Sequence, residues 1–159
     1  MVVKNYTTSI LVEKTIMEIE QLLCKFGAQA IMKEYLGGQV SSLSFFVLFD
    51  DQKIPFKLPL KTEKARSIIS NAVNEGYLPQ RYLNEPLRTE QGLRVGWRII
   101  KDWIHSNLSL LEIEFANPVE IFLPYMHDYV EGKTLYDKFI ENKSKFIALE
   151  ETKSPSESN

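Results

Sequence analysis

The chain has 159 residues, of which 44% are hydrophobic and 25% charged, a composition typical of an ordinary globular protein with one domain. Nineteen lysines and arginines against twenty-one acids give a net charge of -2, which excludes the strongly basic field of histone-like or ribosomal proteins. The single cysteine, Cys24, excludes an intramolecular disulfide and a cysteine-based zinc cluster, and no apolar run approaches the roughly 20 residues that span a bilayer.

The segment from Ser9 to Phe26 has the spacing of an amphipathic helix. Its apolar residues recur at steps of three and four, with charged residues between them. This apolar stripe consists of Val12, Ile16, Ile19, Leu23 and Phe26. Gly27 follows where the helix should end, because glycine adopts the left-handed conformation without a Cβ clash. Cys24 lies among apolar residues of this segment, so we expect a small core residue there and no nucleophile.

Three β-rich runs follow the first helix. The runs are 30–35, 40–49 and 54–60, separated by Gly37-Gly38 and by Asp50-Asp51-Gln52-Lys53. Both separators have the composition of hairpin turns, and the middle run has one wholly apolar face. Pro55 and Pro59 remove two backbone donors from the third run, which favours an edge strand there. The sequence therefore predicts an antiparallel meander with the first helix across one face.

The rest of the chain has helical patterns. The expected helices are 62–75, capped by Thr62; 89–115, capped by Thr89; a short one beginning at Asn117-Pro118; and a weaker one at 135–147. Residues 150–159 are rich in serine and glutamate, so we expect a disordered tail after a single domain of residues 1–149. The predicted fold class is α+β, in which an αβββα order is followed by a long helix and a helical C-terminal half.

A stripe of cations runs along the predicted long helix. Arg94, Arg98, Lys101 and His105 follow one another at steps of four, three and four, which places them on one side of the helix. Such a stripe could bind the phosphates of a nucleic acid or the carboxylates of a partner protein. The alternative is a solvated face whose charges pair with Asp102 and with acids elsewhere in the fold.

Two tryptophans lie six residues apart on the same helix. Trp97 and Trp103 cannot both occupy the centre of one apolar stripe. Either both belong to the core, or one is exposed as an interface anchor. We predict a binding surface formed by Arg94, Arg98, Lys101 and His105, with Trp103 as its aromatic residue.

Enzymatic chemistry has little support in the sequence. Asp51-Gln52-Lys53 matches the (D/E)-x-K element of restriction-type nuclease cores, whose carboxylates bind Mg²⁺, and Glu34 could add a carboxylate. Ordinary hairpin turns use the same residue types. Two histidines, His105 and His127, need a further ligand to hold a metal, and the sequence contains no hydrolytic triad and no glycine-rich phosphate loop. We therefore expect no catalytic residues, no metal and no cofactor.

The middle β run also suggests a platform for stacking unpaired bases. Phe46 lies on the face opposite Phe45 and Phe49. Proteins that bind single strands need such rings exposed and flanked by cations. The nearby charges are Asp50 and Asp51, which oppose the binding of phosphates. Such a platform therefore requires the cationic stripe of the long helix to border the sheet.

Three stretches that together span much of the chain carry a family resemblance. They are Tyr6-Thr7-Thr8-Ser9-Ile10 running into Val12-Glu13-Lys14-Thr15 and Glu18-Ile19; Trp97-Arg98-Ile99-Ile100-Lys101-Asp102-Trp103; and Val119 to Phe122-Leu123-Pro124-Tyr125. These stretches resemble small uncharacterised accessory proteins encoded by tailed bacteriophages and prophages. The resemblance implies a protein of the bacterial host cytoplasm that either binds and blocks a host protein or assists phage DNA replication or recombination.

From these observations we predict a non-enzymatic binding protein. Its partner is a host or phage protein, such as a nuclease or defence complex that it modulates or inhibits in the manner of an anti-CRISPR protein. The alternative is a single-stranded DNA-binding or recombination accessory protein that uses the cationic stripe, and the third hypothesis is a Mg²⁺-dependent nuclease. We expect no membrane contact, and the long helix leaves room for a homodimer.

Overall fold

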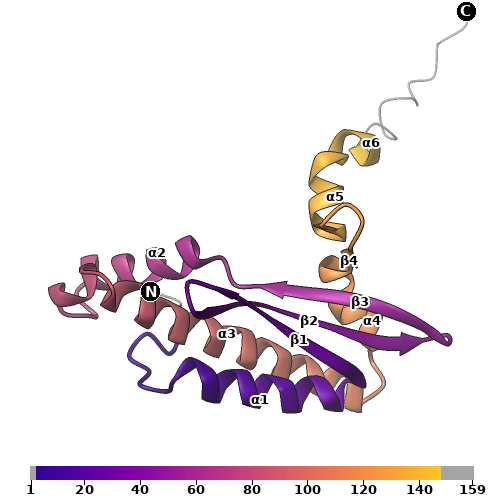
Figure 1. Ribbon diagram of the computed structural model, residues 1–159, viewed down its shortest axis with the longest axis horizontal. Coiled ribbons are helices and arrows are strands. Elements are labelled where there is room, and N and C mark those ends of the chain that lie inside the picture. Colours follow the sequence, from indigo (N-terminus) through magenta and orange to yellow (C-terminus); the bar gives the residue numbers. More distant parts are fainter. Residues whose placement is uncertain (1–2, 148–159) are drawn as a thin grey trace, which may run out of the picture.

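The computed structural model describes residues 3–147 and has an α+β architecture (Figure 1). A three-stranded antiparallel sheet packs against helices, and a small hairpin with two short helices follows towards the C-terminal end. This arrangement confirms the predicted fold class. The tail predicted at residues 150–159 lies outside the described residues.

The first helix, α1 (Val12–Lys25), forms where the apolar spacing predicts it. All five residues of the predicted stripe are buried, and Gly27 follows the helix with a positive φ of 92°. Cys24, however, is exposed, so the prediction of a core cysteine is wrong. The reason is geometric, because each residue of a helix is rotated by about 100° from the one before, which turns Cys24 away from the buried Leu23.

The sheet is the predicted meander. Its strands are β1 (Ala28–Leu36), β2 (Gln39–Phe49) and β3 (Gln52–Pro59), in the order β1-β2-β3. Both connections are tight turns with two positive φ angles each, 57° and 76° at Gly37 and Gly38, and 48° and 60° at Asp50 and Asp51. Such turns match the twist of the flanking strands, and glycine and aspartate tolerate the left-handed region that they require.

The inner face of the sheet builds the main core with α1 and the long helix. The buried side chains of β2 and β3 on this face are Leu43, Phe45, Val47, Phe56 and Leu58. Phe45 and Phe56 both contact Phe122, at ring-centroid distances of 5.1 and 5.7 Å. The C-terminal part of the chain therefore contributes to the same core as the N-terminal helix and sheet.

The helices α2 (Thr62–Asn74) and α3 (Leu87–Glu112) pack on each other, with the 3-10 helix η1 (Gln80–Leu83) between them in the chain. Thr62 is the first helical residue of α2 and not its cap; the cap position is Lys61, whose side chain makes no capping hydrogen bond. The predicted Thr89 cap is also wrong. α3 begins two residues earlier, and the Glu85 carboxylate accepts hydrogen bonds from the Thr89 backbone N–H (3.2 Å) and hydroxyl (2.7 Å).

After α3 the chain forms several short elements. They are α4 (Pro118–Phe122), the 3-10 helix η2 (Leu123–Tyr125), β4 (His127–Asp128), β5 (Lys133–Thr134), α5 (Leu135–Glu141) and α6 (Lys143–Ile147). α4 starts as predicted, because the Asn117 side chain accepts a hydrogen bond from the Glu120 backbone N–H (3.1 Å). The helix predicted at 135–147 is divided at Asn142.

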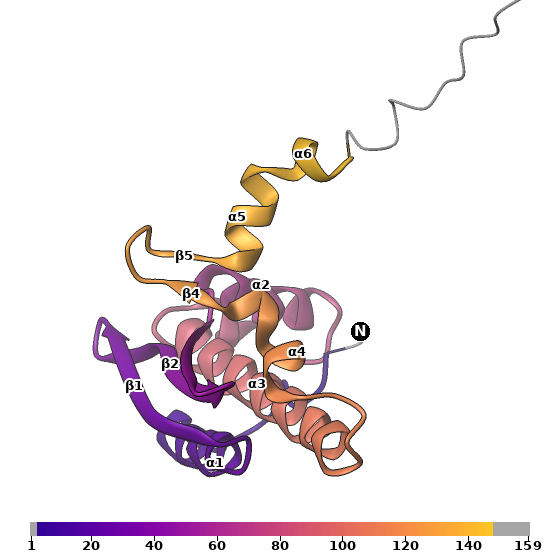
Figure 2. The same cartoon turned by 90° about the vertical axis from the view of Figure 1, so that its right-hand side faces the viewer.

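We refer to residues 127–147 as the C-terminal arm. The arm projects from the body formed by the sheet and the longer helices (Figures 1 and 2). Its base is tied to the edge strand β3, where Phe56 forms an antiparallel bridge with Met126. The Leu135 backbone N–H donates to the Met126 carbonyl at 2.8 Å, so the end of the β4–β5 hairpin is also bonded to Met126. The arm is therefore attached to the body at its base by backbone hydrogen bonding, and its far end projects away from the body.

Candidate functional site

The cationic stripe of α3 has partners inside the protein. Arg98 is only 14% exposed, and its guanidinium lies 2.5 Å from the Glu18 carboxylate of α1. The Lys101 ammonium lies 2.9 Å from the Asp102 carboxylate. Arg94 is half-buried and His105 is exposed. Two of the four stripe residues thus belong to ion pairs, as in the alternative of a face whose charges pair within the fold.

The two tryptophans belong to the same core cluster but differ in burial. Trp97 is fully buried, and its indole Nε1 donates to the Val40 carbonyl at 3.2 Å. Trp103 is half-buried and packs edge-on against Phe122 and Tyr125, with ring centroids 5.7 and 5.6 Å away. Trp103 therefore connects α3 to the segment that leads into the arm.

The acids considered for a nuclease site lie at opposite ends of the sheet. Asp50 and Asp51 form the β2–β3 turn, whereas Glu34 pairs in register with Ser42 near the other end of β2. The Glu34 carboxylate accepts hydrogen bonds from Ser42 Oγ and Lys57 Nζ, both at 2.7 Å. Among residues 3–147, no three histidine, cysteine or acidic side chains are grouped so that they could hold a metal ion.

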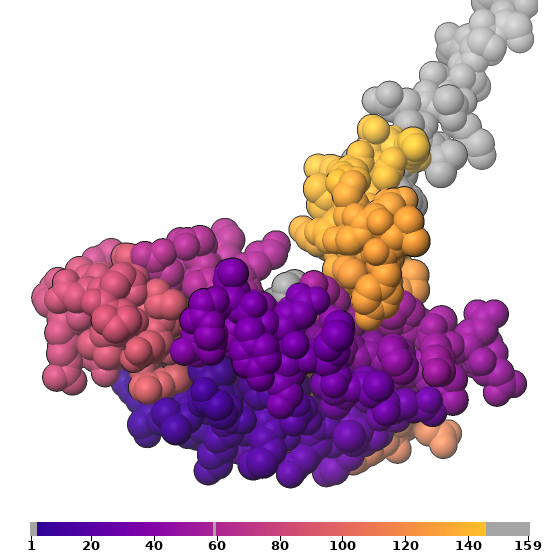
Figure 3. All heavy atoms as spheres, viewed as in Figure 1, coloured from indigo at the N-terminus to yellow at the C-terminus, as the bar shows by residue number. Residues whose placement is uncertain are grey.

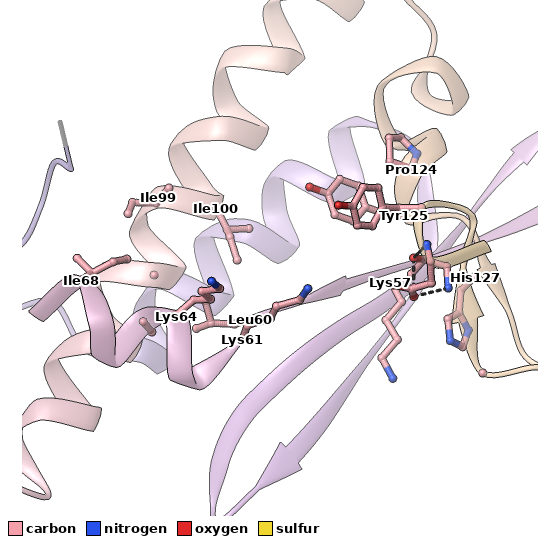
Figure 4. A pocket seen from close by; sticks show the side chains of 16 residues that line it. Lys57, Leu60, Lys61, Lys64, Ile68, Ile99, Ile100, Pro124, Tyr125 and His127 are labelled. Atoms are coloured by element: carbon pink, nitrogen blue, oxygen red, sulfur yellow. Dashed lines mark hydrogen bonds between the residues drawn. The ribbon is translucent and has the colours of Figure 1, made fainter. Parts of the chain in front are cut away.

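A pocket of about 670 Å³ lies where the body meets the arm, and we call it the junction pocket. The body contributes the end of β3 and residues of α2 and α3, and the arm contributes β4, β5 and the start of α5. Figure 4 shows Ile68, Ile99 and Ile100 on one side of the pocket and Pro124 and Tyr125 on the other. The walls are therefore mostly apolar.

Three lysines, Lys57, Lys61 and Lys64, line the junction pocket (Figure 4). The Lys57 ammonium is paired with Glu34 (2.7 Å), and this hydrogen bond, together with that from Ser42, lowers the pKa of the Glu34 carboxyl. Lys64 has no hydrogen bond or ion pair within the described part of the chain. Lys61 likewise forms no ion pair among the described residues, although its charge acts on Asp137, so Lys61 and Lys64 are the two lysines of the pocket outside an ion pair.

One acid, Asp137, is among the lining residues that the structure describes. It is the third residue of α5 and belongs to a capping box with Thr134. Its carboxylate accepts from the Thr134 backbone N–H (2.9 Å) and hydroxyl (2.8 Å), which lower the pKa of Asp137; the charge of Lys61 acts in the same direction. Asp137 therefore keeps its negative charge, but Lys61 and Lys64 outnumber it, so the pocket keeps a positive character.

Next to the pocket, two buried polar atoms have no hydrogen-bond partner among residues 3–147. They are Ser44 Oγ, beside Lys57 in the β2–β3 register, and His127 Nδ1. The His127 ring packs edge-on against Tyr129 at 4.7 Å. Buried polar groups are usually satisfied, so these two atoms, one on β2 and one on β4, have unused capacity for hydrogen bonds.

The arm also exposes large apolar side chains. Val130 is 96% exposed, Tyr136 52% and Ile140 49%, and Leu123 at the base of the arm is also exposed. A second hollow of about 720 Å³ lies between η2 and α5 and is lined mainly by apolar groups. Figure 3 shows the arm standing out from the body, so its apolar side chains face solvent.

Comparison with models of known families, with curated proteins and with solved structures finds no match to this chain. Within residues 3–147, no helix combines the length and apolarity needed to cross a membrane. The described part of the chain thus offers two candidate surfaces, the junction pocket and the apolar side chains of the arm.

Sequence reasoning missed both of these surfaces. The available signal for the pocket is a cluster of four lysines within residues 53–64. Lys57 lies on β3 and Lys64 on α2, and no local pattern indicates that the arm closes over the space between them. The strands β4 and β5 have two residues each, too few for an alternation of apolar and polar residues to be recognised.

Proposed function

We propose that the protein is a non-enzymatic binding protein that engages a second protein through the C-terminal arm and modulates it. The sequence resemblance to phage accessory proteins makes a host nuclease or defence complex the expected target. The observation that supports the proposal is the exposed apolar surface of the arm. Contiguous exposed apolar side chains are typical of protein interaction sites.

The charges of the arm favour recognition by apolar contacts. Lys138 is paired with Asp128 (2.5 Å), and Lys133 is paired with Glu141 (2.8 Å). These pairs and the capping box hold the hairpin and α5 together, so little ordering should be needed when a partner binds. We expect the partner to contact the exposed apolar side chains of the arm, among them Val130 and Ile140.

The test compares arm variants with a matched body variant. Val130→Asp and Ile140→Asp place a charge on exposed positions of the arm, and Ile113→Asp does the same at an exposed position, 70% exposed, beyond the end of α3. Tagged protein is used to capture partners from bacterial lysate, followed by mass spectrometry and binding measurements with the purified partner. We expect one partner to be retained by wild type and Ile113→Asp and lost from both arm variants.

Two results would contradict this function. One is a partner that binds both arm variants as well as wild type, which would place the interface elsewhere. The other is repeated recovery of nucleic acid in place of any protein. Circular dichroism of each variant checks that the fold is intact, so that a loss of binding reports on the surface.

One contact favours single-stranded DNA binding as a second candidate. The Lys53 ammonium, for which no ion pair is found among the described residues, lies 5.4 Å from the centroid of the Phe46 ring. An aromatic ring beside cations is the kind of surface that stacks unpaired bases. Because Arg98 and Lys101 are paired, the sheet face replaces the α3 stripe as the expected surface. A wild-type protein that shifts no oligonucleotide at low salt would exclude this function.

A further inference from the structure

The junction pocket combines an apolar interior with unpaired positive charge. We propose that it binds a small amphiphilic anion, in which a carboxylate or phosphate is attached to an apolar or aromatic body. This inference concerns a different surface from the apolar side chains tested above, Val130 and Ile140, neither of which lines the pocket. It therefore holds or fails independently of the protein partner.

The size and walls of the pocket fit a small molecule. A volume of about 670 Å³ is within the range of roughly 300 to 1,000 Å³ that small-molecule sites occupy. Leu60, Ile68, Ile99 and Ile100 supply the apolar walls on the body side. Such walls favour the hydrocarbon or ring of a ligand, because its burial removes apolar surface from water.

The charge of the ligand follows from the lysines. Lys57 is neutralised by Glu34, whereas Lys61 and Lys64 lie near the α2 end of the pocket with Asp137 as the one acid of the described lining. Asp137 is held by two hydrogen bonds from Thr134. An anion entering the pocket would therefore meet two ammonium groups without displacing an existing ion pair. Two ammonium groups against the single Asp137 carboxylate leave a net positive charge, which a neutral or cationic ligand would not compensate.

The ligand would also join the two parts of the molecule. Lys61, Lys64 and Ile68 belong to the body, whereas Thr134, Tyr136 and Asp137 belong to the arm. A molecule that contacts both sides stabilises the arm in the orientation seen here, since binding to one state shifts the population towards it. We therefore expect ligand binding to slow hydrogen exchange in α5.

Two naphthalene dyes separate the contribution of charge from that of apolar burial. 8-Anilinonaphthalene-1-sulfonate carries a sulfonate, and N-phenyl-1-naphthylamine has the same ring system without charge. We expect the anionic dye to bind wild type about tenfold more tightly, which corresponds to about 1.4 kcal/mol. In Lys61→Gln with Lys64→Gln, the two dyes should bind equally, while binding of the neutral dye stays unchanged and shows that the pocket is intact.

The matched control is Lys14→Gln with Lys25→Gln, two exposed lysines on α1 outside the pocket. This variant should bind both dyes as wild type does. Equal affinity of the two dyes for wild type would overturn the proposal. It would also be overturned if the affinity for the anionic dye fell by the same factor in the pocket variant and in the control variant.

Displacement of the anionic dye distinguishes two sources of the same chemistry. Decanoate represents a carboxylate on an aliphatic chain, and adenosine monophosphate represents a phosphate on an aromatic body. Displacement by either supports the proposal and identifies the source. If neither decanoate nor adenosine monophosphate displaces the dye at concentrations up to about 1 mM, a concentration typical of weak specific binding, the proposal is contradicted.

Discussion

Gly92 of α3 lies directly against the backbone of Ala65 in α2. A Cβ atom at residue 92 would lie 2.8 Å from the carbonyl carbon and the carbonyl oxygen of Ala65, which is closer than real Cβ atoms approach other atoms. Both residues are buried. The absence of a side chain at Gly92 therefore sets the distance between the two helices that form one wall of the junction pocket.

We predict that Gly92→Ala destabilises the protein by about 1–3 kcal/mol, because the added methyl group meets backbone that cannot rotate away. This would outweigh the gain of about 1 kcal/mol that alanine has over glycine inside a helix. Urea denaturation followed by circular dichroism measures the change.

The control for this prediction is Gly96→Ala, one turn further along α3. There the nearest atom is a terminal methyl of Leu60, at 2.6 Å, and this flexible end can move. We expect a smaller change in stability for Gly96→Ala than for Gly92→Ala. A Gly92→Ala protein as stable as wild type would show that the helices separate easily at this contact.

Trp97 is predicted to contribute more to stability than Trp103. Trp97→Phe removes the indole N–H that donates to the Val40 carbonyl and leaves a cavity at a fully buried position, which should cost about 2–3 kcal/mol. Trp103→Phe, at a half-buried position, should cost less. Chemical denaturation of both variants gives the comparison, and equal losses would argue against the central role of the Val40 contact.

Arg98 is predicted to act in stability through its contact with Glu18. Arg98→Ala leaves the Glu18 carboxylate without its partner in a largely buried contact, so we expect a loss of about 1–2 kcal/mol. Arg94→Ala, on the same stripe, should change stability by less than about 0.5 kcal/mol. A double-mutant cycle with Glu18→Gln measures the interaction energy between Arg98 and Glu18. The absence of an interaction energy would mean that the Arg98 side chain is free to bind a partner.

The arm should loosen in acid. Hydrogen bonds from the Lys138 ammonium, followed by those from the Glu131 and Val130 backbone N–H groups, lower the pKa of Asp128 to about 2. In the unfolded chain an aspartate titrates near pH 4, about two units higher. Because the unfolded state then binds more protons, the stabilisation is present above about pH 4 and is lost as the pH falls towards 2.

NMR titration of the Asp128 carboxyl and of the Val130 amide measures this effect. We expect both signals to change with a midpoint near pH 2 in the folded protein. Asp128→Asn should remove the titration and increase hydrogen exchange in the β4–β5 hairpin at neutral pH. A midpoint near 4 would mean that the Lys138 contact does not persist in solution.

Much of the fold follows from local patterns. The apolar stripe of α1, the turns at Gly37-Gly38 and Asp50-Asp51, and the Asn117 cap all depend on residues close together in the sequence. The prediction of a Thr89 cap is wrong because α3 already begins at Leu87, so Thr89 lies inside the first turn, where its N–H and hydroxyl donate to the Glu85 carboxylate. The prediction for Cys24 is wrong because the rotation of about 100° from Leu23 to Cys24 places the Cys24 side chain on the exposed side of α1.

The candidate surfaces depend on contacts between residues that are distant in the sequence. Arg98 and Glu18 are 80 residues apart in the chain, so the sequence alone could not tell a paired arginine from a free one. The junction pocket joins β3, α2 and α3 to an arm more than 60 residues further along than Lys57.

The sequence by itself determined the α+β class, the meander and the main helices, because hydrophobic period and turn chemistry act over a few residues. It also determined a nearly balanced net charge. Only the tertiary structure decided where that charge is unmatched. Folding pairs Arg98 and Lys101 of the α3 stripe and leaves Lys61 and Lys64 unpaired beside an apolar pocket, because ion pairing depends on which side chains the fold brings within a few ångströms of each other.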